Sequence, residues 1–164
     1  MATKRQIFYS FHFDNDVMRV QQVRNIGALE DNTPVSVNDW ETVKRGGDRA
    51  IEKWIDDNMK YRSCVVVLIG QDTASRRWVQ HEIVKGWNEG KGVVGINIHN
   101  LKCPRNGTSR KGINPFDQIS FGNNGLKLSS IVKCYDPLSL YPYQHIKDDI
   151  ENWVEEAIRI RNQY

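Results

Sequence analysis

The sequence predicts an α/β fold in which helices cover both faces of a parallel sheet. Strand-like and helix-like segments alternate along its 164 residues. Two apolar runs, at residues 64–69 and 92–98, are continuous rather than alternating, which is typical of strands buried on both faces. Helical periodicity lies between these runs, as the crossover connection of a parallel strand pair requires. These observations favour a layered α/β domain over a sandwich or a helical bundle.

The first strand and the first helix are expected in the opening 26 residues. The run Gln6 to Phe11 is aromatic and β-branched, and it predicts a strand. The acidic group Asp14-Asn15-Asp16 comes directly after it. Such residues favour a helix start through capping and the helix dipole. The spacing of Val17, Val20 and Val23 predicts that this helix continues to about Ile26.

A weak strand and a second helix are expected next. Val35 and Val37 flank Ser36 and predict a short second strand of alternating type. The segment Asn38-Asp39-Trp40-Glu41 is expected to be a loop. Asp48 can cap a helix that runs to about Met59.

The centre of the chain gives the clearest signals. The run 64–69 predicts a buried strand, and a helix is expected from Ser75, as N-cap, to a stop at Gly90. Apolar residues recur at helical spacing in it and predict a core-facing stripe: Val79, Ile83 and Trp87. Residues 92–98 predict the next buried strand.

The last third of the chain begins with a change of composition. Residues 100–124 are rich in Gly, Asn, Pro, Lys and Ser, and they predict a long loop or insertion that extends to about residue 130. A last strand is expected at 131–135 and an amphipathic helix at 143–162. One domain, 1–164, with five strands in a flavodoxin-like arrangement, is therefore predicted.

Composition excludes several classes of protein. The formal charge is only +3 and the basic residues are scattered, so nucleic-acid binding is not expected. No apolar run has membrane-spanning length, and a cytoplasmic location is expected. Cys64, Cys103 and Cys134 are too widely spaced for a disulfide framework or a CxxC metal site.

Motifs for common cofactors are absent from the sequence. There is no GxGxxG, no GxxxxGK[ST] and no GxSxG, and no two histidines stand at metal-ligand spacing. No cofactor and no metal is therefore expected. A receiver-like phospho-switch stays open as an alternative, since Asp14-Asn15-Asp16 follows the first strand. Its further acidic residue, Asp72, comes three residues late, and the Lys expected after the last strand is missing.

Glu82 is the residue of chemical interest. It lies off the apolar stripe of its helix, on the side shared with Gly86, and near the carboxyl end of the preceding strand. Open α/β sheets bind ligands at that end. Judged by its own sequence position alone, Glu82 would be interpreted as an ordinary glutamate on the surface of a helix.

Two segments resemble TIR domains. Residues 6–12, QIFYSFH, are similar to the first TIR box, and residues 75–83, SRRWVQHEI, to the TIR helix pattern SxxWCxxEL. Further segments resemble the bacterial TIR-like group that includes the Thoeris antiphage sensor. These segments are FYSFHF, NDWE, VVVLIG, GVVGINIHN and NPFD. The resemblance covers about residues 5–136. The RDxxPG second box of eukaryotic members is replaced by Asn38 to Glu41.

The resemblance implies a flavodoxin-like fold and an NAD-consuming activity. It implies that Glu82 is the catalytic residue for cleaving the nicotinamide–ribose bond, with a cyclic ADP-ribose-type product that serves as an antiphage signal. The oxocarbenium-like state of such a cleavage is one that a carboxylate can stabilise. Residues expected at the substrate are Ser10, Phe11, His12, Asp39, Trp40 and Arg77, the last at the pyrophosphate.

The resemblance also implies partners. The product would activate an effector protein, and the family leaves room for a phage-derived activator and for a homo-oligomer. The alternative is a non-catalytic TIR-like adaptor that only assembles with like domains.

Overall fold

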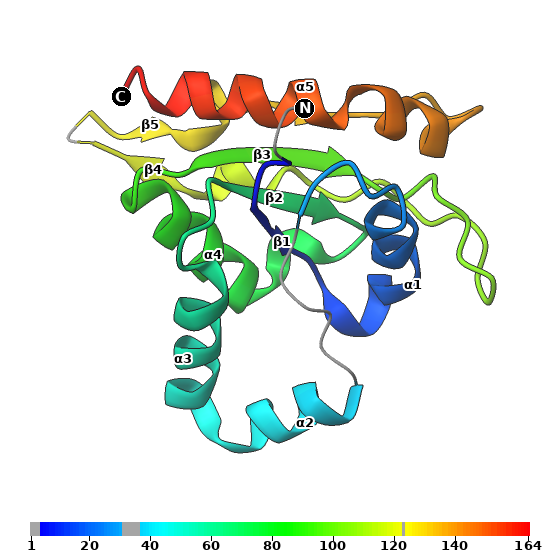
Figure 1. Cartoon of the computed structure of the whole chain (residues 1–164), viewed down its shortest axis with the longest axis horizontal. Helices are drawn as coiled ribbons and strands as arrows, with labels where there is room; N and C mark the ends of the chain where they lie inside the picture. Colours follow the sequence, from blue (N-terminus) through cyan, green and yellow to red (C-terminus); the bar gives the residue numbers. More distant parts are fainter. Residues whose placement is uncertain (1–3, 31–36, 123) are drawn as a thin grey trace.

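A computed structural model describes residues 4–30, 37–122 and 124–164, with side chains from residue 41 in the second segment (Figure 1). The central sheet of this described part has four parallel strands in the order β1-β2-β3-β6. They are β1 (Ile7–Ser10), β2 (Cys64–Ile69), β3 (Gly92–Asn97) and β6 (Cys134–Tyr135). The predicted parallel α/β architecture is confirmed, with four strands in place of five.

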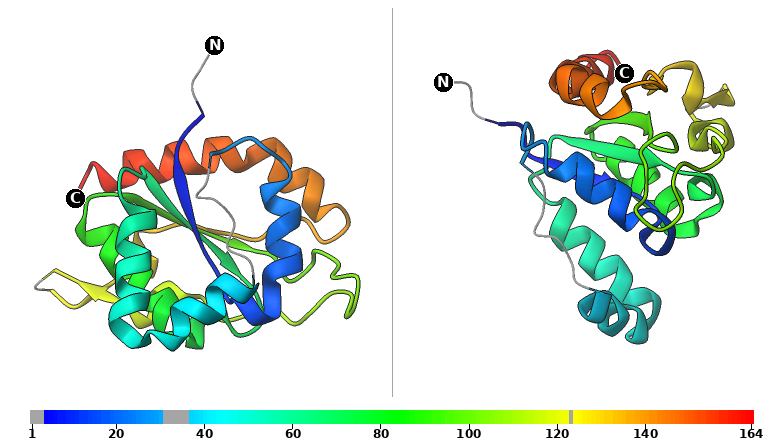
Figure 2. Two further views of the ribbon diagram at one scale, coloured as in Figure 1. Left: turned by 60° about the horizontal axis from the view of Figure 1, so that its bottom comes forward. Right: turned by 90° about the vertical axis from the view of Figure 1, so that its right-hand side faces the viewer.

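Helices cover both faces of this sheet. Helices α1 (Phe13–Arg24) and α5 (Pro142–Arg161) pack on one face, and α3 (Gly47–Met59) and α4 (Arg77–Asn88) on the other (Figure 2). Figure 1 shows α5 lying along the sheet, whereas α3 leads away from it toward α2 (Val37–Arg45). The two helical layers bury two separate apolar clusters, one on each side of the sheet.

At Val37 the predicted second strand is wrong. Val37 begins helix α2, and Val35 lies outside the described residues. The expected loop at 38–41 is also wrong, because those residues belong to the same helix. An alternating pattern of three residues is weak evidence for a strand. The nine-residue helix that forms instead is stabilised by an ion pair between Glu41 and Lys44, which lie one turn apart. In the described part of the chain, a parallel bridge between Gln6 and Glu30 extends the sheet beyond β1.

The alternation of β1 decides which side chains can meet α4. Ile7 and Tyr9 belong to the cluster under α1 and α5, and Phe8 belongs to the cluster under α3 and α4. Because side chains alternate along a strand, Ser10 shares the face of Phe8. The last residue of β1 therefore turns toward α4.

Helix α4 begins slightly later than predicted. Ser75 lies in a short 3₁₀ turn, η1 (Thr73–Ser75), and its hydroxyl donates to the carbonyl of Asp72, so the predicted N-cap role is wrong. Arg76 occupies the N-cap position instead. The predicted apolar stripe is buried, and Gly90 has the positive φ of +81° that suits a helix stop.

The long segment after β3 carries more structure than expected. It contains the turn η2 (Pro115–Gln118), the antiparallel pair β4 (Ser120–Phe121) and β5 (Leu126–Lys127), and the turn η3 (Leu128–Ser130). The strand predicted at 131–135 is reduced to the two residues of β6. The C-terminal helix is confirmed within one residue at each end.

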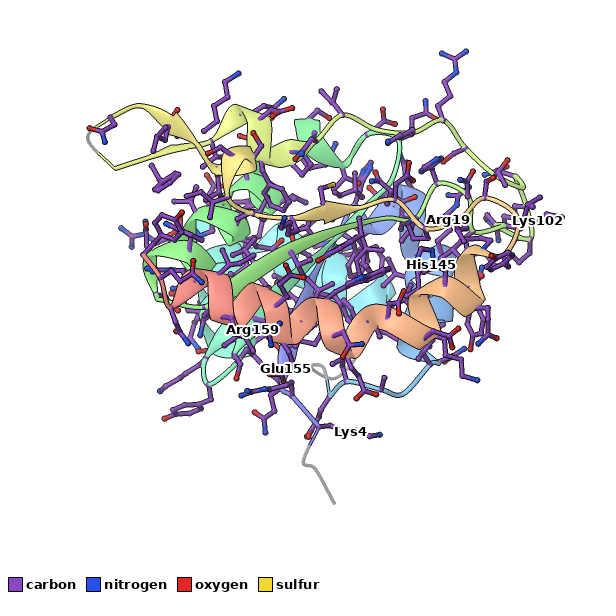
Figure 3. The ribbon with its side chains drawn as sticks, turned by 90° about the horizontal axis from the view of Figure 1, so that it is seen from above. Lys4, Arg19, Lys102, His145, Glu155 and Arg159 are labelled. Carbon is purple, nitrogen blue, oxygen red and sulfur yellow. The ribbon has the colours of Figure 1, made fainter. Side chains whose placement is uncertain are left out.

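Arg19 of α1 fixes the start of that segment to the domain. Its guanidinium donates to the carbonyls of Leu101 and Gly107, both at 2.9 Å, and pairs with Asp16. Figure 3 shows Arg19 beside the chain that carries Lys102, at one end of the molecule. Among the described helices, none is long and apolar enough to cross a membrane.

Candidate active site

Glu82 is a buried carboxylate at the junction of α4 and β1. Only 7% of the residue is exposed, and its Oε1 accepts a hydrogen bond of 2.8 Å from Oγ of Ser10. Burial raises the pKa of Glu82 to about 8, and the hydrogen bond from Ser10 opposes that rise. A glutamate with these surroundings is not the surface residue that the isolated sequence would indicate.

A cavity of about 390 Å³ opens beside this carboxylate. Its lining comes from the end of β1, from helices α1, α2 and α3, and from the first turns of α4. The lining residues are Tyr9, Phe11, His12, Phe13, Asp14, Arg24, Lys44, Trp54, Ile55, Ser75, Arg76, Arg77, Trp78, Val79 and Glu82. The cavity thus lies at the carboxyl end of β1, where parallel sheets bind ligands.

Aromatic side chains give the cavity flat walls. Phe11 and Phe13 stack with ring centroids 6.1 Å apart and an interplanar angle of 28°. The guanidinium of Arg24 lies 5.5 Å from the centroid of Phe11. Trp78, with Arg77 4.5 Å from its ring, forms another flat surface. Such surfaces suit planar heterocycles, which gain from stacking.

Basic groups at the start of α4 add positive potential. Arg77 forms an ion pair with Asp48 of α3, so its charge is already shared. Arg76 lines the cavity from the N-cap position, where the free N–H groups of a helix also favour anions. A phosphorylated ligand would meet complementary charge at this end.

His12 lies between these basic groups and α1. Burial lowers its pKa, and the nearby Arg76 lowers it further, so the imidazole is neutral at pH 7. Its Nδ1 atom is buried and has no hydrogen-bond partner among the described residues. A neutral imidazole can accept or donate one bond to a hydroxyl of a ligand.

The structure brings most of the predicted site residues together. Phe11, His12, Arg77 and Glu82 line one cavity. Ser10 contacts Glu82 but does not line the cavity itself. Asp39 and Trp40 lie in α2, and their side chains fall outside the described part, so their roles stay predictions.

Several lining residues were missed by the sequence interpretation. Arg76 and Trp54 both line the cavity but are not among the residues expected at the substrate. Phe13 directly follows the predicted residues, and this adjacency could have pointed to it. Arg24 gave no signal, since its place above Phe11 depends on how α1 packs against β1.

The acidic group after β1 is arranged differently from a phospho-acceptor site. Asp16 is buried against Arg19, with Oδ1 3.2 Å from Nη1. Asp72 accepts a hydrogen bond of 3.0 Å from the Asn15 amide. Within the described ranges, no three His, Cys, Asp or Glu side chains are grouped to hold a metal ion.

Comparisons with known proteins found a family model and a relative that match this chain. The family model described as "Thoeris protein ThsB, TIR-like domain" matches residues 8–103, a range that includes both Ser10 and Glu82. A Bacillus cereus (strain MSX-D12) protein named "Putative cyclic ADP-D-ribose synthase ThsB1" is 34% identical over 122 residues. The match covers 71% of this chain and 64% of that relative. The chain therefore belongs to the Thoeris ThsB family of TIR-like domains.

Proposed function

We propose that this chain cleaves the nicotinamide–ribose bond of NAD and closes the remaining ADP-ribose into a cyclic signal. The observation that carries the proposal is the buried carboxylate of Glu82, which lines a cavity with aromatic walls and a basic end. Membership of the TIR-like family supports it, as does the printed name of the Bacillus cereus relative.

The chemistry asks one carboxylate to act on a cationic substrate. The bond between the ribose C1′ and the pyridinium nitrogen breaks, its electron pair goes to nicotinamide, and positive charge develops at C1′. The Glu82 carboxylate stabilises that charge. An atom of the adenosine half then attacks C1′ and loses its proton to give the cyclic product. Attack by water gives linear ADP-ribose instead.

Burial of Glu82 suits this role. An ionised carboxylate away from water is unfavourable by itself, which is why its pKa is raised. A bound pyridinium supplies the opposite charge and favours the ionised form. The substrate thus helps to create the carboxylate that acts on it.

The other lining groups have roles that follow from their chemistry. Phe11, Phe13 and Trp78 offer surfaces for the two rings of NAD. Arg76 and Arg77 offer charge for the pyrophosphate, and His12 offers a hydrogen bond for a ribose hydroxyl.

Antiphage defence is part of the proposal. The cyclic product would activate an effector protein, and a phage-derived component would start its synthesis. A homo-oligomeric form of the chain is compatible with this role.

The test is a search for nucleotide products with and without Glu82. Cells that make the wild-type chain or Glu82→Gln are infected with phage, and nicotinamide and cyclic and linear ADP-ribose are measured by mass spectrometry. The wild type should accumulate a cyclic product, and Glu82→Gln should lower it by about 10² or more. Glu52→Gln, on the exposed face of α3, is the matched control and should behave as wild type.

The same experiment separates the adaptor alternative. A domain that only assembles with like domains gives no nucleotide product from any variant, and Glu82→Gln then protects cells as well as wild type does. Full product formation by Glu82→Gln would contradict the catalytic assignment.

A further inference from the structure

The contact between Ser10 and Glu82 joins two elements that are far apart in the chain. Ser10 ends β1, Glu82 lies in the middle of α4, and 72 residues separate them. The Ser10 hydroxyl is 2.8 Å from Oε1 of Glu82, and Ser10 is only 1% exposed. Glu82 lines the cavity, whereas Ser10 lies behind it.

We propose that Ser10 is a positioning residue for the reaction, which fixes one oxygen of the Glu82 carboxylate and leaves the other oxygen to the substrate. This inference rests on the proposed function. It replaces the expectation from the sequence that Ser10 binds substrate directly, because the hydroxyl proton is already donated to Glu82 and the side chain is covered.

The hydrogen bond also acts on the protonation of Glu82. Burial raises the pKa of that carboxyl. Among the described groups, the hydrogen bond from Ser10 is the interaction that lowers this pKa. A hydroxyl that donates to a carboxylate favours the ionised form, since the charged acceptor makes the stronger bond. Without the Ser10 hydroxyl, Glu82 would hold its proton at neutral pH more firmly.

The backbone explains why a small hydroxyl residue fits this place. The parallel register of β1 on β2 sets Ser10 beside Val67, and both lie on the sheet face that α4 covers. Ser10 is almost fully buried at a hydrogen-bond distance from Glu82, so a longer donor would have to displace that carboxylate. Serine combines a donor with nearly the smallest side-chain volume.

The experiment follows the Glu82 carboxyl directly, without requiring activity. Protein labelled with ¹³C at the glutamate carboxyl is titrated by NMR, and the Glu82 signal is assigned by its loss in Glu82→Gln. The wild-type signal should titrate near pH 8, the pKa raised by burial. Ser10→Ala should titrate about one pH unit higher or more.

Two further variants make the comparison specific. Ser10→Thr keeps the hydroxyl and should titrate as wild type does. Val66→Ala removes core volume from the other face of the sheet, so it should lower stability and leave the titration unchanged. If Ser10→Ala does not fold, Ser10→Cys replaces it, and its weaker thiol donor should also raise the titration midpoint.

Nicotinamide release from NAD is measured with the same proteins across pH. In Ser10→Ala the rise of kcat/KM with pH should move upward with the NMR midpoint, while Ser10→Thr restores the wild-type profile. A Ser10→Ala titration identical to wild type would overturn the inference and leave NAD cleavage standing. A shifted titration with no nicotinamide from any variant, either as purified protein or in phage-infected cells, supports the role of Ser10 on the carboxylate and overturns the proposed function.

Discussion

A β-carbon added to Gly86 would lie 2.5 Å from Cγ2 of Val65, so the backbone of α4 rests on the Val65 side chain of β2 with no room for a helix side chain at that point. Gly86 is one turn beyond Glu82 on the same side of the helix. The close approach of helix and strand at Gly86 therefore sets how deeply the Glu82 carboxylate is placed beside β1.

Gly86→Ala should disturb both stability and the site. The added methyl group forces α4 away from β2, and overpacking of this kind costs about 1–3 kcal/mol of unfolding free energy. The Ser10–Glu82 distance should lengthen, and nicotinamide release should fall. Urea unfolding and the NAD assay measure the two effects. Val84→Ala, at an exposed position of α4, should change neither, and an unaffected Gly86→Ala would show that the approach is looser than described.

Stability should depend on pH through Glu82. Its pKa is about 8 in the folded protein against 4.5 for an ordinary glutamate, so the folded state holds a proton that the unfolded chain has lost between these values. The resulting stabilisation is complete below about pH 4.5 and is lost as the pH rises to about 8, by an amount on the order of a few kcal/mol.

Urea unfolding of wild type and Glu82→Gln at pH 5, 6, 7 and 8.5 measures this difference. Glu82→Gln carries no proton to lose at this position, so it should become more stable relative to wild type as the pH rises. Parallel pH curves for the two proteins would contradict the raised pKa.

Binding of NAD should depend on the arginines at the start of α4. Arg76→Ala and Arg77→Ala should each weaken NAD binding by about tenfold, because each removes a charged hydrogen-bond donor for the pyrophosphate. Asp48→Ala should instead strengthen NAD binding, since it frees Arg77 from its ion pair. Calorimetric titration of the Glu82→Gln background avoids turnover. Equal affinity in all three variants would place the pyrophosphate elsewhere.

The buried pair Asp16–Arg19 should matter for stability rather than for chemistry. Arg19→Met leaves Asp16 buried without its cation and two carbonyls without their donor, which should cost about 3–5 kcal/mol. The amides of Cys103 and Gly107, which bond to each other's carbonyls, should exchange hydrogen faster.

A double variant supplies the control for that pair. Asp16→Asn combined with Arg19→Met removes the uncompensated charge and should be less destabilised than Arg19→Met alone. A double variant that is as unstable as the sum of its single variants would show that the two side chains act independently.

The sequence predicts the buried framework of this fold well. Residues 64–69 and 92–97 form strands and 142–161 form a helix, because long apolar patterns leave few alternatives. It fails at Val37, because an alternating pattern of three residues cannot decide between strand and helix. Ser75 shows the same limit, since a hydroxyl near a helix start can bond within the preceding turn instead.

The site was predictable only in part, for a different reason. Glu82 stands out through its helical position relative to Gly86 and through the family resemblance. Its bond to Ser10 depends on the parallel pairing of β1 with β2 and on the packing of α4, which no local pattern encodes. Arg24 is a clearer case, because its place above Phe11 follows from tertiary packing alone.

The cavity and the helix that supports its sheet from behind come from different parts of the chain. The described residues that line the cavity lie between Tyr9 and Glu82, whereas α5, which packs on the opposite side of β2 and β3, is formed by Pro142–Arg161. Removal of α5 would bare the apolar cluster on that side and take away much of its helical cover. The shape of the cavity therefore depends on a helix that contributes no side chain to its wall.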